Sequence, residues 1–384
     1  MNSNTLLNPS ASLHSRRSVL IKTAQLGLAT LASSPLSLAA PVAHANTRKT
    51  QGTTMLETIK PASLALTQEW DKIFPKSNKV THRKVTFMNR FGLTLAADLY
   101  MPKELSAGKH AAIAVSGPFG AVKEQSSGFH AQTLAERGWI TIAFDPAFTG
   151  ESGGFPHNIA AGDINTEDFS AAVDFLVTLP EVDENRIGIL GICGWGGMAL
   201  NAATVDPRIR ATVTTTMYDM SRVMSNGYND VADSAEARQA QRKAIAEIRT
   251  KNAKAGTFAA GTPGLPETLK GDEAQFVKDY WEYYKTPRGF HARSINSNGA
   301  WNPLTPLSFI NMPLLRYIDE IETPVLMLHG EKAHSRYFSE DAFKRLKGTN
   351  KELYIVAGAN HTDLYDKKVP FEKIDAFYAS TLGR

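Results

Sequence analysis

The sequence predicts an α/β fold, a doubly wound and mostly parallel sheet covered by helices on both faces, with a helical cap inserted late in the chain. Short apolar runs alternate with helical segments from about residue 110 onward, a pattern typical of buried parallel strands with crossover helices. Two runs before this point are joined by a short turn and predict an antiparallel start. The alternation stops between Thr216 and Pro324, where the insertion is expected.

Each expected element follows from local sequence. The strand candidates are rich in Val, Ile, Leu and aromatic residues and lie at 83–88, 93–100, 110–115, 139–144, 186–192, 209–216, 324–329 and 352–357. Helical spacing of apolar residues predicts core helices at about 123–137, 167–179, 197–205, 337–347 and 370–381. Parallel neighbours require such crossovers, so helices should cover both faces of the sheet.

The segment 220–320 departs from this alternation. It contains a polar helix from Ser234 to Lys254, a Gly/Pro-rich loop and an aromatic stretch around 276–284. An insertion at this place is most simply a helical cap over the carboxyl ends of the strands. A separate small domain with its own binding role is the alternative. The core would then comprise residues 81–219 and 321–384.

The amino-terminal segment predicts export. Arg16 and Arg17 precede a moderately apolar run, and 43–45 (AHA) supplies a small-x-small cleavage site. Residues 1–45 are therefore expected to be a twin-arginine signal, recognised by the Tat export machinery, with residues 46–80 as a lead-in segment. A membrane anchor is the alternative, but polar residues interrupt the run. The mature protein should be periplasmic or secreted, without a membrane anchor.

Composition limits the possible partners. The chain has 42 Lys and Arg against 38 Asp and Glu; the signal holds three basic and no acidic residues, which leaves 39 against 38. A nearly neutral protein gives no reason to expect nucleic acid as a partner, and a small-molecule substrate is expected instead. One cysteine excludes an intrachain disulfide. We find no phosphate-binding loop, dinucleotide fingerprint or metal-ligand motif, so no cofactor and no metal are expected.

Residues 186–197 (RIGILGICGWGG) contain that single cysteine, Cys193. A buried strand here runs into glycines and then a helix, the local arrangement that mounts a nucleophile on a sharp turn. Together with the order of elements and a late His, this segment resembles the α/β-hydrolase superfamily, most closely dienelactone-hydrolase-like bacterial hydrolases whose elbow reads G-x-C. The resemblance covers roughly 80–384 without the cap, and implies Cys193 as nucleophile. A buried packing cysteine is the alternative.

The same resemblance implies an oxyanion hole. Its backbone N–H donors would be Gly194 and, from the turn 116–120, Phe119 or Gly120, because Pro118 has no N–H. This chain departs from the family at Trp195, where a small residue is usual. Trp195 is therefore expected beside the substrate pocket.

His361, in the loop after the last strand, has the chain order of the general base. A direct thiol–imidazole pair would lower the pKa of Cys193. The family usually places a carboxylate after the seventh strand, where this chain has Ala333; Glu331 is the nearest candidate, and Asp219 after the sixth strand is the alternative.

These residues predict a cofactor-independent, exported hydrolase that cleaves an ester, lactone or thioester carbonyl through a Cys-His-acid site. Two alternatives remain open. The first is a catalytically silent, ligand-binding homologue, which a pocket-blocking Trp195 would favour. The second is an acyl transferase that uses the same site.

Overall fold

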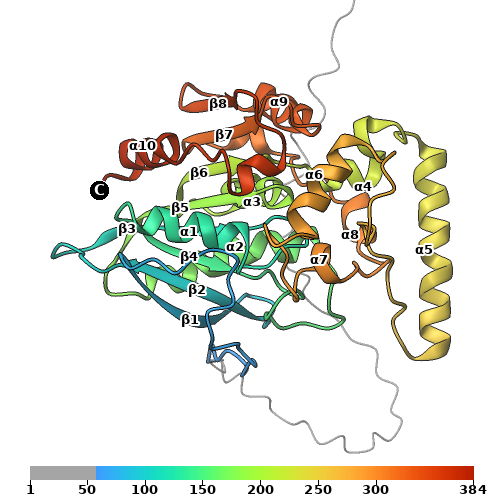
Figure 1. Ribbon diagram of the computed structural model, residues 1–384, viewed down its shortest axis with the longest axis horizontal. Helices are drawn as coiled ribbons and strands as arrows, with labels where there is room; N and C mark the ends of the chain where they lie inside the picture. The colour runs from blue at the N-terminus through green and yellow to red at the C-terminus, as the bar shows by residue number, and fades with distance from the viewer. Residues whose placement is uncertain (1–57) are drawn as a thin grey trace, which may run out of the picture. The chain divides into compact units, whose positions relative to one another are not determined.

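The computed structural model describes residues 58–384, so the predicted signal and the first part of the lead-in lie outside the described residues. An eight-stranded sheet has the order β1-β2-β4-β3-β5-β6-β7-β8 (Figure 1). The strands are β1 (Val80–Met88), β2 (Thr94–Pro102), β3 (His110–Ser116), β4 (Ile140–Phe144), β5 (Val182–Ile192), β6 (Ile209–Thr215), β7 (Val325–Gly330) and β8 (Lys351–Val356). Only the pairs β1–β2 and β2–β4 are antiparallel. The predicted mostly parallel α/β fold is confirmed.

Helices cover both faces of the sheet, and each connects or flanks parallel strands (Figure 1). The core helices are α1 (Ser126–Ala135), α2 (Gly162–Val177), α3 (Gly194–Val205), α9 (Arg336–Arg345) and α10 (Phe371–Leu382). Alternate residues of each strand face opposite ways. In β5, Ile187 and Ile189 belong to the same buried cluster as residues of α2, α3 and α9, whereas Leu190 and Ile192 belong to the cluster that contains residues of α1 and α10.

The predicted insertion lies between β6 and β7. It contains α4 (Met220–Asn226), α5 (Ala235–Ala255), α6 (Gln275–Tyr284), α7 (Ile295–Asn298) and α8 (Pro306–Ile310), with 3₁₀ turns at Tyr228–Asp230 and Ile318–Glu320. These helices gather at one side of the sheet, with the long α5 outermost (Figure 1). Within residues 58–384, no helix has both the length and the apolar character that a bilayer-spanning helix needs.

Buried ion pairs hold the loop after β3 in place. Lys123 is fully buried, and its Nζ lies 2.8 Å from Asp145 Oδ2 and 2.6 Å from Glu151 Oε2. Its backbone N–H also donates to Asp145 Oδ1 at 2.7 Å. Burial alone would raise the pKa of Glu151, but the neighbouring Lys123 ammonium and hydrogen bonds lower it to about 2. These pairs tie the loop after β3 to the loop after β4.

The insertion joins the same network. Arg293 Nη2 lies 2.9 Å from Glu124 Oε1 and 2.6 Å from Asp71 Oδ2, so one guanidinium links the insertion to the start of α1 and to the lead-in. Lys84 of β1 lies 3.2 Å from the same Glu124 oxygen. In the sequence, Lys123 and Glu124 read as ordinary charged residues at the start of the helix expected at about 123–137, so nothing there predicted this network.

Candidate active site

Cys193 lies on a strained turn between β5 and α3. Its backbone has φ +58° and ψ −126°, a region that L side chains rarely adopt. The turn is fixed because Cys193 N–H donates to Thr215 O, while Cys193 O accepts from Gly196 and Tyr218, each at 2.9 Å. A tight, glycine-flanked turn is what the sequence predicted at this position.

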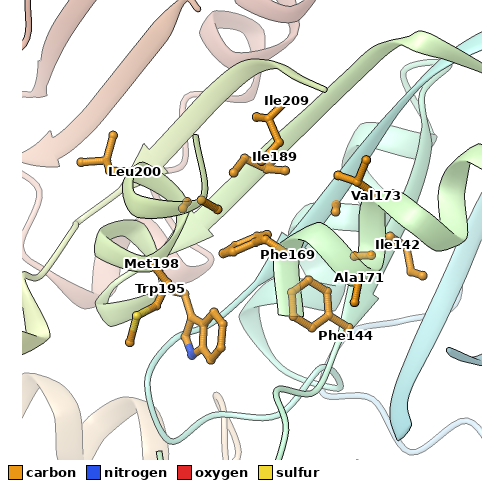
Figure 2. Packing of buried hydrophobic residues seen from close by; sticks show 14 of the residues in the cluster. Ile142, Phe144, Phe169, Ala171, Val173, Ile189, Trp195, Met198, Leu200 and Ile209 are labelled. Atoms are coloured by element: carbon orange, nitrogen blue, oxygen red, sulfur yellow. The ribbon is translucent and has the colours of Figure 1, made fainter. Parts of the chain in front are cut away.

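Gly191 and Trp195 explain how this turn is accommodated. A Cβ on Gly191 would lie 2.2 Å from Trp195 O, so the close approach of strand and helix requires glycine there. The Trp195 side chain lies in the hydrophobic core, where it is 2% exposed and packs edge-on against Phe144 and Phe169 (Figure 2). Cys193 belongs to the buried cluster on the other face of the sheet. The structure thus places Trp195 in the core, away from the predicted substrate pocket, because α3 directs this position toward α2.

Two backbone N–H groups face the Cys193 sulfur. The N–H groups of Phe119 and Gly194 are both near enough to donate hydrogen bonds to the thiolate, and these bonds would lower the pKa of Cys193. Gly120, the other candidate donor, instead packs against α7: a Cβ there would lie 2.4 Å from Asn296 Oδ1. The arrangement provides two converging donors, the geometry that stabilises a developing oxyanion.

His361 is fully buried near Cys193, but no direct hydrogen bond joins the two within residues 58–384. Its Nε2 lies 3.1 Å from the Tyr365 hydroxyl instead. Tyr365 ends the 3₁₀ turn Thr362–Tyr365, which begins directly after His361. The Tyr365 hydroxyl is also near enough to the Cys193 sulfur for a hydrogen bond that would lower the pKa of the thiol. The sequence contained this tyrosine in GANHTDLYD, four residues after the histidine, without any motif that marked it.

The two predicted carboxylates do not contact His361 in the described part of the chain. Glu331 is exposed and accepts from Gly358 N–H at 2.8 Å. Asp219 caps α4 by accepting from Arg222 N–H at 3.0 Å. Both carboxylates are therefore held by backbone donors away from the imidazole, and neither supplies the acid at the place where the sequence led us to expect one.

Hydroxyl groups lie where a triad carboxylate would. His361 Nδ1 lies 2.6 Å from Ser335 Oγ and 2.8 Å from Thr216 Oγ1. Ser335 Oγ also lies 2.9 Å from His329 Nε2, and His329 Nδ1 lies 2.7 Å from Ser339 Oγ. This chain of neutral groups runs away from Cys193 along the start of α9.

The prediction that a direct thiol–imidazole pair lowers the pKa of Cys193 is wrong for the resting protein. Burial raises the pKa of Cys193, and hydrogen bonds from Tyr365 and the two backbone N–H groups only partly oppose this. Burial, together with His334 and His329, holds the pKa of His361 well below its usual range. Because no carboxylate among residues 58–384 is hydrogen-bonded to His361 to favour an imidazolium, thiol and imidazole both rest in their neutral forms.

Tyrosines from the insertion enclose the site. The ring of Tyr280, on α6, lies 5.2 Å from that of His361, and Tyr280 donates to Tyr218 Oη at 3.4 Å. Tyr284, also on α6, is buried near Cys193. Cys193 is consequently only 7% exposed. The aromatic stretch of the insertion, noted in the sequence, therefore covers the cysteine.

A separate open cavity of about 1180 Å³ lies beside α5. Its walls come from the loop after β4, from α5 and the loop that follows it, and from residues near α8; they include Phe155, Arg249 and Phe258. Neither Cys193 nor His361 lines it. No group of three or more His, Cys, Asp or Glu side chains in the described region is arranged to hold a metal ion.

Comparison with known proteins gives matches over most of the chain, among them one at high identity. The uncharacterized protein PA2218 of Pseudomonas aeruginosa is 60% identical over 318 residues, 82% of this chain and 85% of that protein. Its crystal structure has a TM-score of 0.81 at 59% identity, covering 84% of this chain and 100% of that one.

One solved structure shows the same fold, and one relative and one family model carry descriptions that refer to thioester hydrolysis. The α/β hydrolase GrgF from Penicillium sp. sh18 has a TM-score of 0.64 at 21% identity, over 79% of this chain and 100% of that one, and shows the fold alone. Thiohydrolase aneE of Aspergillus aculeatus is 32% identical over 134 residues, 35% of this chain and 41% of that protein. The family model described as BAAT / Acyl-CoA thioester hydrolase C terminal matches residues 164–258.

Proposed function

Because this chain belongs to the family of PA2218, within the α/β-hydrolase superfamily, we propose that it cleaves a thioester or ester carbonyl with Cys193 as the nucleophile. The observation that carries the proposal is the strained turn of Cys193, which places its sulfur beside the N–H groups of Phe119 and Gly194. The thioester-hydrolase family model spans 164–258 and includes this turn, and supports the same chemistry. The likeness to dienelactone hydrolases stays a prediction.

The mechanism follows from these groups. The thiol loses its proton toward His361, and the sulfur attacks the substrate carbonyl carbon. The carbonyl oxygen becomes an oxyanion, which accepts hydrogen bonds from Phe119 and Gly194. When the tetrahedral intermediate collapses, the leaving thiol or alcohol takes the proton from His361 and an acyl-Cys193 thioester remains. Water, deprotonated by His361, then attacks the acyl carbon. The C–S bond breaks, the acid is released, and the sulfur of Cys193 takes the proton back from His361.

A substrate panel tests this proposal. We expect the purified protein to hydrolyse some members of a series of N-acetylcysteamine thioesters and p-nitrophenyl esters with acyl chains of increasing length. Intact-protein mass spectrometry after rapid acid quenching should show the acyl group added to Cys193. Turnover without any acyl adduct, undiminished in Cys193→Ala, would refute the assignment.

Acyl transfer is the second candidate, and the enclosure of Cys193 favours testing it. A site that is 7% exposed limits the entry of bulk water and favours an acceptor that binds before it reacts. Adding alcohol or amine acceptors to the same panel separates the two outcomes, because transfer yields a new ester or amide in place of the free acid. A pocket-blocking Trp195 would have favoured the third candidate, a catalytically silent, ligand-binding homologue. Trp195 lies in the core and does not block the cysteine, so this support is absent.

Export through the twin-arginine pathway is also proposed, on the paired arginines and the AHA site at 43–45. We expect the mature amino terminus at Asn46. Replacing Arg16 and Arg17 together by lysine should leave the precursor in the cytoplasm, because the export machinery reads the arginine pair. Fractionation and amino-terminal sequencing measure both results. A double variant that is exported as efficiently as the natural sequence would exclude this pathway.

A further inference from the structure

The Tyr365 hydroxyl lies between the two reacting groups of the proposed site. It is 3.1 Å from His361 Nε2, and it is near enough to the Cys193 sulfur for a hydrogen bond that would lower the pKa of the thiol. Within residues 58–384 no hydrogen bond joins the imidazole directly to the thiol. The phenol is therefore the group that neighbours both the thiol and its base.

The position of Tyr365 is fixed by its surroundings. The side chain is fully buried, and its ring packs edge-on against Tyr283 with centroids 4.9 Å apart and against Tyr284 with centroids 6.2 Å apart. Its backbone carbonyl accepts from Ser126 Oγ at 3.0 Å. Contacts on several sides restrain the ring, so the hydroxyl is held in one place rather than sampling several.

We propose that Tyr365 is a catalytic residue that passes the proton of the Cys193 thiol to Nε2 of His361. In this step the S–H bond breaks as an O–H bond forms on Tyr365, while the original Tyr365 O–H bond breaks as an N–H bond forms on His361. The phenol is neutral before and after the step. The new thiolate then accepts hydrogen bonds from Tyr365, Phe119 and Gly194, and the charges are one thiolate and one imidazolium.

The far side of His361 supplies what this transfer needs. Nε2 can accept a proton only if Nδ1 carries one, and a protonated Nδ1 can donate to Ser335 Oγ at 2.6 Å or Thr216 Oγ1 at 2.8 Å. Ser335 can in turn donate to His329 Nε2 at 2.9 Å. The hydroxyls can thus accept from the tautomer that a carboxylate fixes in a triad, without adding a negative charge.

The role of Tyr365 rests on the proposed nucleophile, but it can be measured without a substrate. Iodoacetamide reacts with the thiolate, so the rate of Cys193 alkylation reports proton loss from the thiol itself. We expect Tyr365→Phe to slow alkylation at pH 7 about tenfold or more, because a hydrogen bond to the charged form is lost together with the route to the base. If Tyr365→Phe slows alkylation as expected but the wild type hydrolyses none of the panel substrates, the proposed function is contradicted and the role of Tyr365 is not.

Tyr283→Phe is the matched control. Tyr283 is equally buried beside Tyr365, and its hydroxyl has no hydrogen-bond partner among residues 58–384. This variant removes one hydroxyl from the same aromatic cluster and should change the alkylation rate by less than about twofold. Circular dichroism and thermal melting of both variants check that they fold.

A second variant tests the relay even if Tyr365→Phe folds poorly. His361→Ala should also slow alkylation. Relative to His361→Ala, the double variant should be slower only by the lost Tyr365 hydrogen bond to the thiolate, and its total effect should be clearly smaller than the product of the two single effects, because both residues serve one proton path. Independent, multiplying effects would overturn the relay. So would a Tyr365→Phe protein that is alkylated as fast as the wild type or faster, because Tyr365 would then only separate the thiol from its base.

Discussion

Replacing Cys193 by alanine is expected to reduce hydrolysis by about a thousandfold or more, because the acyl-enzyme cannot form without the sulfur. Residual activity should come only from the Phe119 and Gly194 N–H groups, which remain in place. Since alanine is smaller than cysteine and must adopt the same positive φ of +58°, the fold should be retained at similar strain. Initial rates on any substrate found in the panel measure the loss, and thermal melting checks the fold.

Cys193→Ser is the informative companion. The hydroxyl occupies nearly the same place and keeps both oxyanion donors, but its proton is harder to remove and the resting His361 is a weak base, with its pKa held low by burial. We expect a small remnant of activity on oxygen esters. Full activity in the alanine variant would show that Cys193 is a packing residue, as its burial alone would allow.

Replacing Lys123 by methionine is expected to lower the free energy of unfolding by about 3–5 kcal/mol, the usual result of removing one partner from buried ion pairs. The fully buried ammonium lies within 2.8 Å of carboxylate oxygens of Glu124, Asp145 and Glu151. Its loss leaves these carboxylates close together with less positive charge. Urea unfolding followed by tryptophan fluorescence measures the change.

Lys347→Ala is the control for a lysine in an ion pair at the surface. Lys347 pairs with Asp319 at 2.9 Å, but 74% of its side chain is exposed. Solvent screens such a pair, so the unfolding midpoint should hardly move. If Lys123→Met unfolded at the same urea concentration as this control, the buried network would not stabilise the fold in the way described.

The fold could be predicted because its signals are local and repeated. All eight expected strands and the five core helices are present, with ends that differ by a few residues. β5 begins at Val182 rather than at residue 186, because its polar first residues carry no apolar signal. Burial on both faces leaves continuous apolar runs, and their alternation with helices admits few other topologies.

The site could be predicted only where chain order carried information. Cys193 follows a buried strand and His361 follows the last one, so both were found as candidates. The resemblance also named Glu331 and Asp219. A triad carboxylate must accept a hydrogen bond from the imidazole, but these two carboxylates accept from backbone N–H groups instead. Tyr365 becomes a candidate only once a 3₁₀ turn brings it back to His361, because no spacing rule marks it.

Cys193 is the only cysteine in the 384-residue sequence, so thiol labelling of the protein counts the molecules in which Cys193 has reacted. One thiol-directed label adds one mass to one position, so the unmodified fraction in an intact mass spectrum equals the fraction of molecules whose Cys193, the proposed nucleophile, is still free. An inhibitor, acyl donor or oxidant can thus be titrated against the intact chain, without masking mutations, and its stoichiometry read directly.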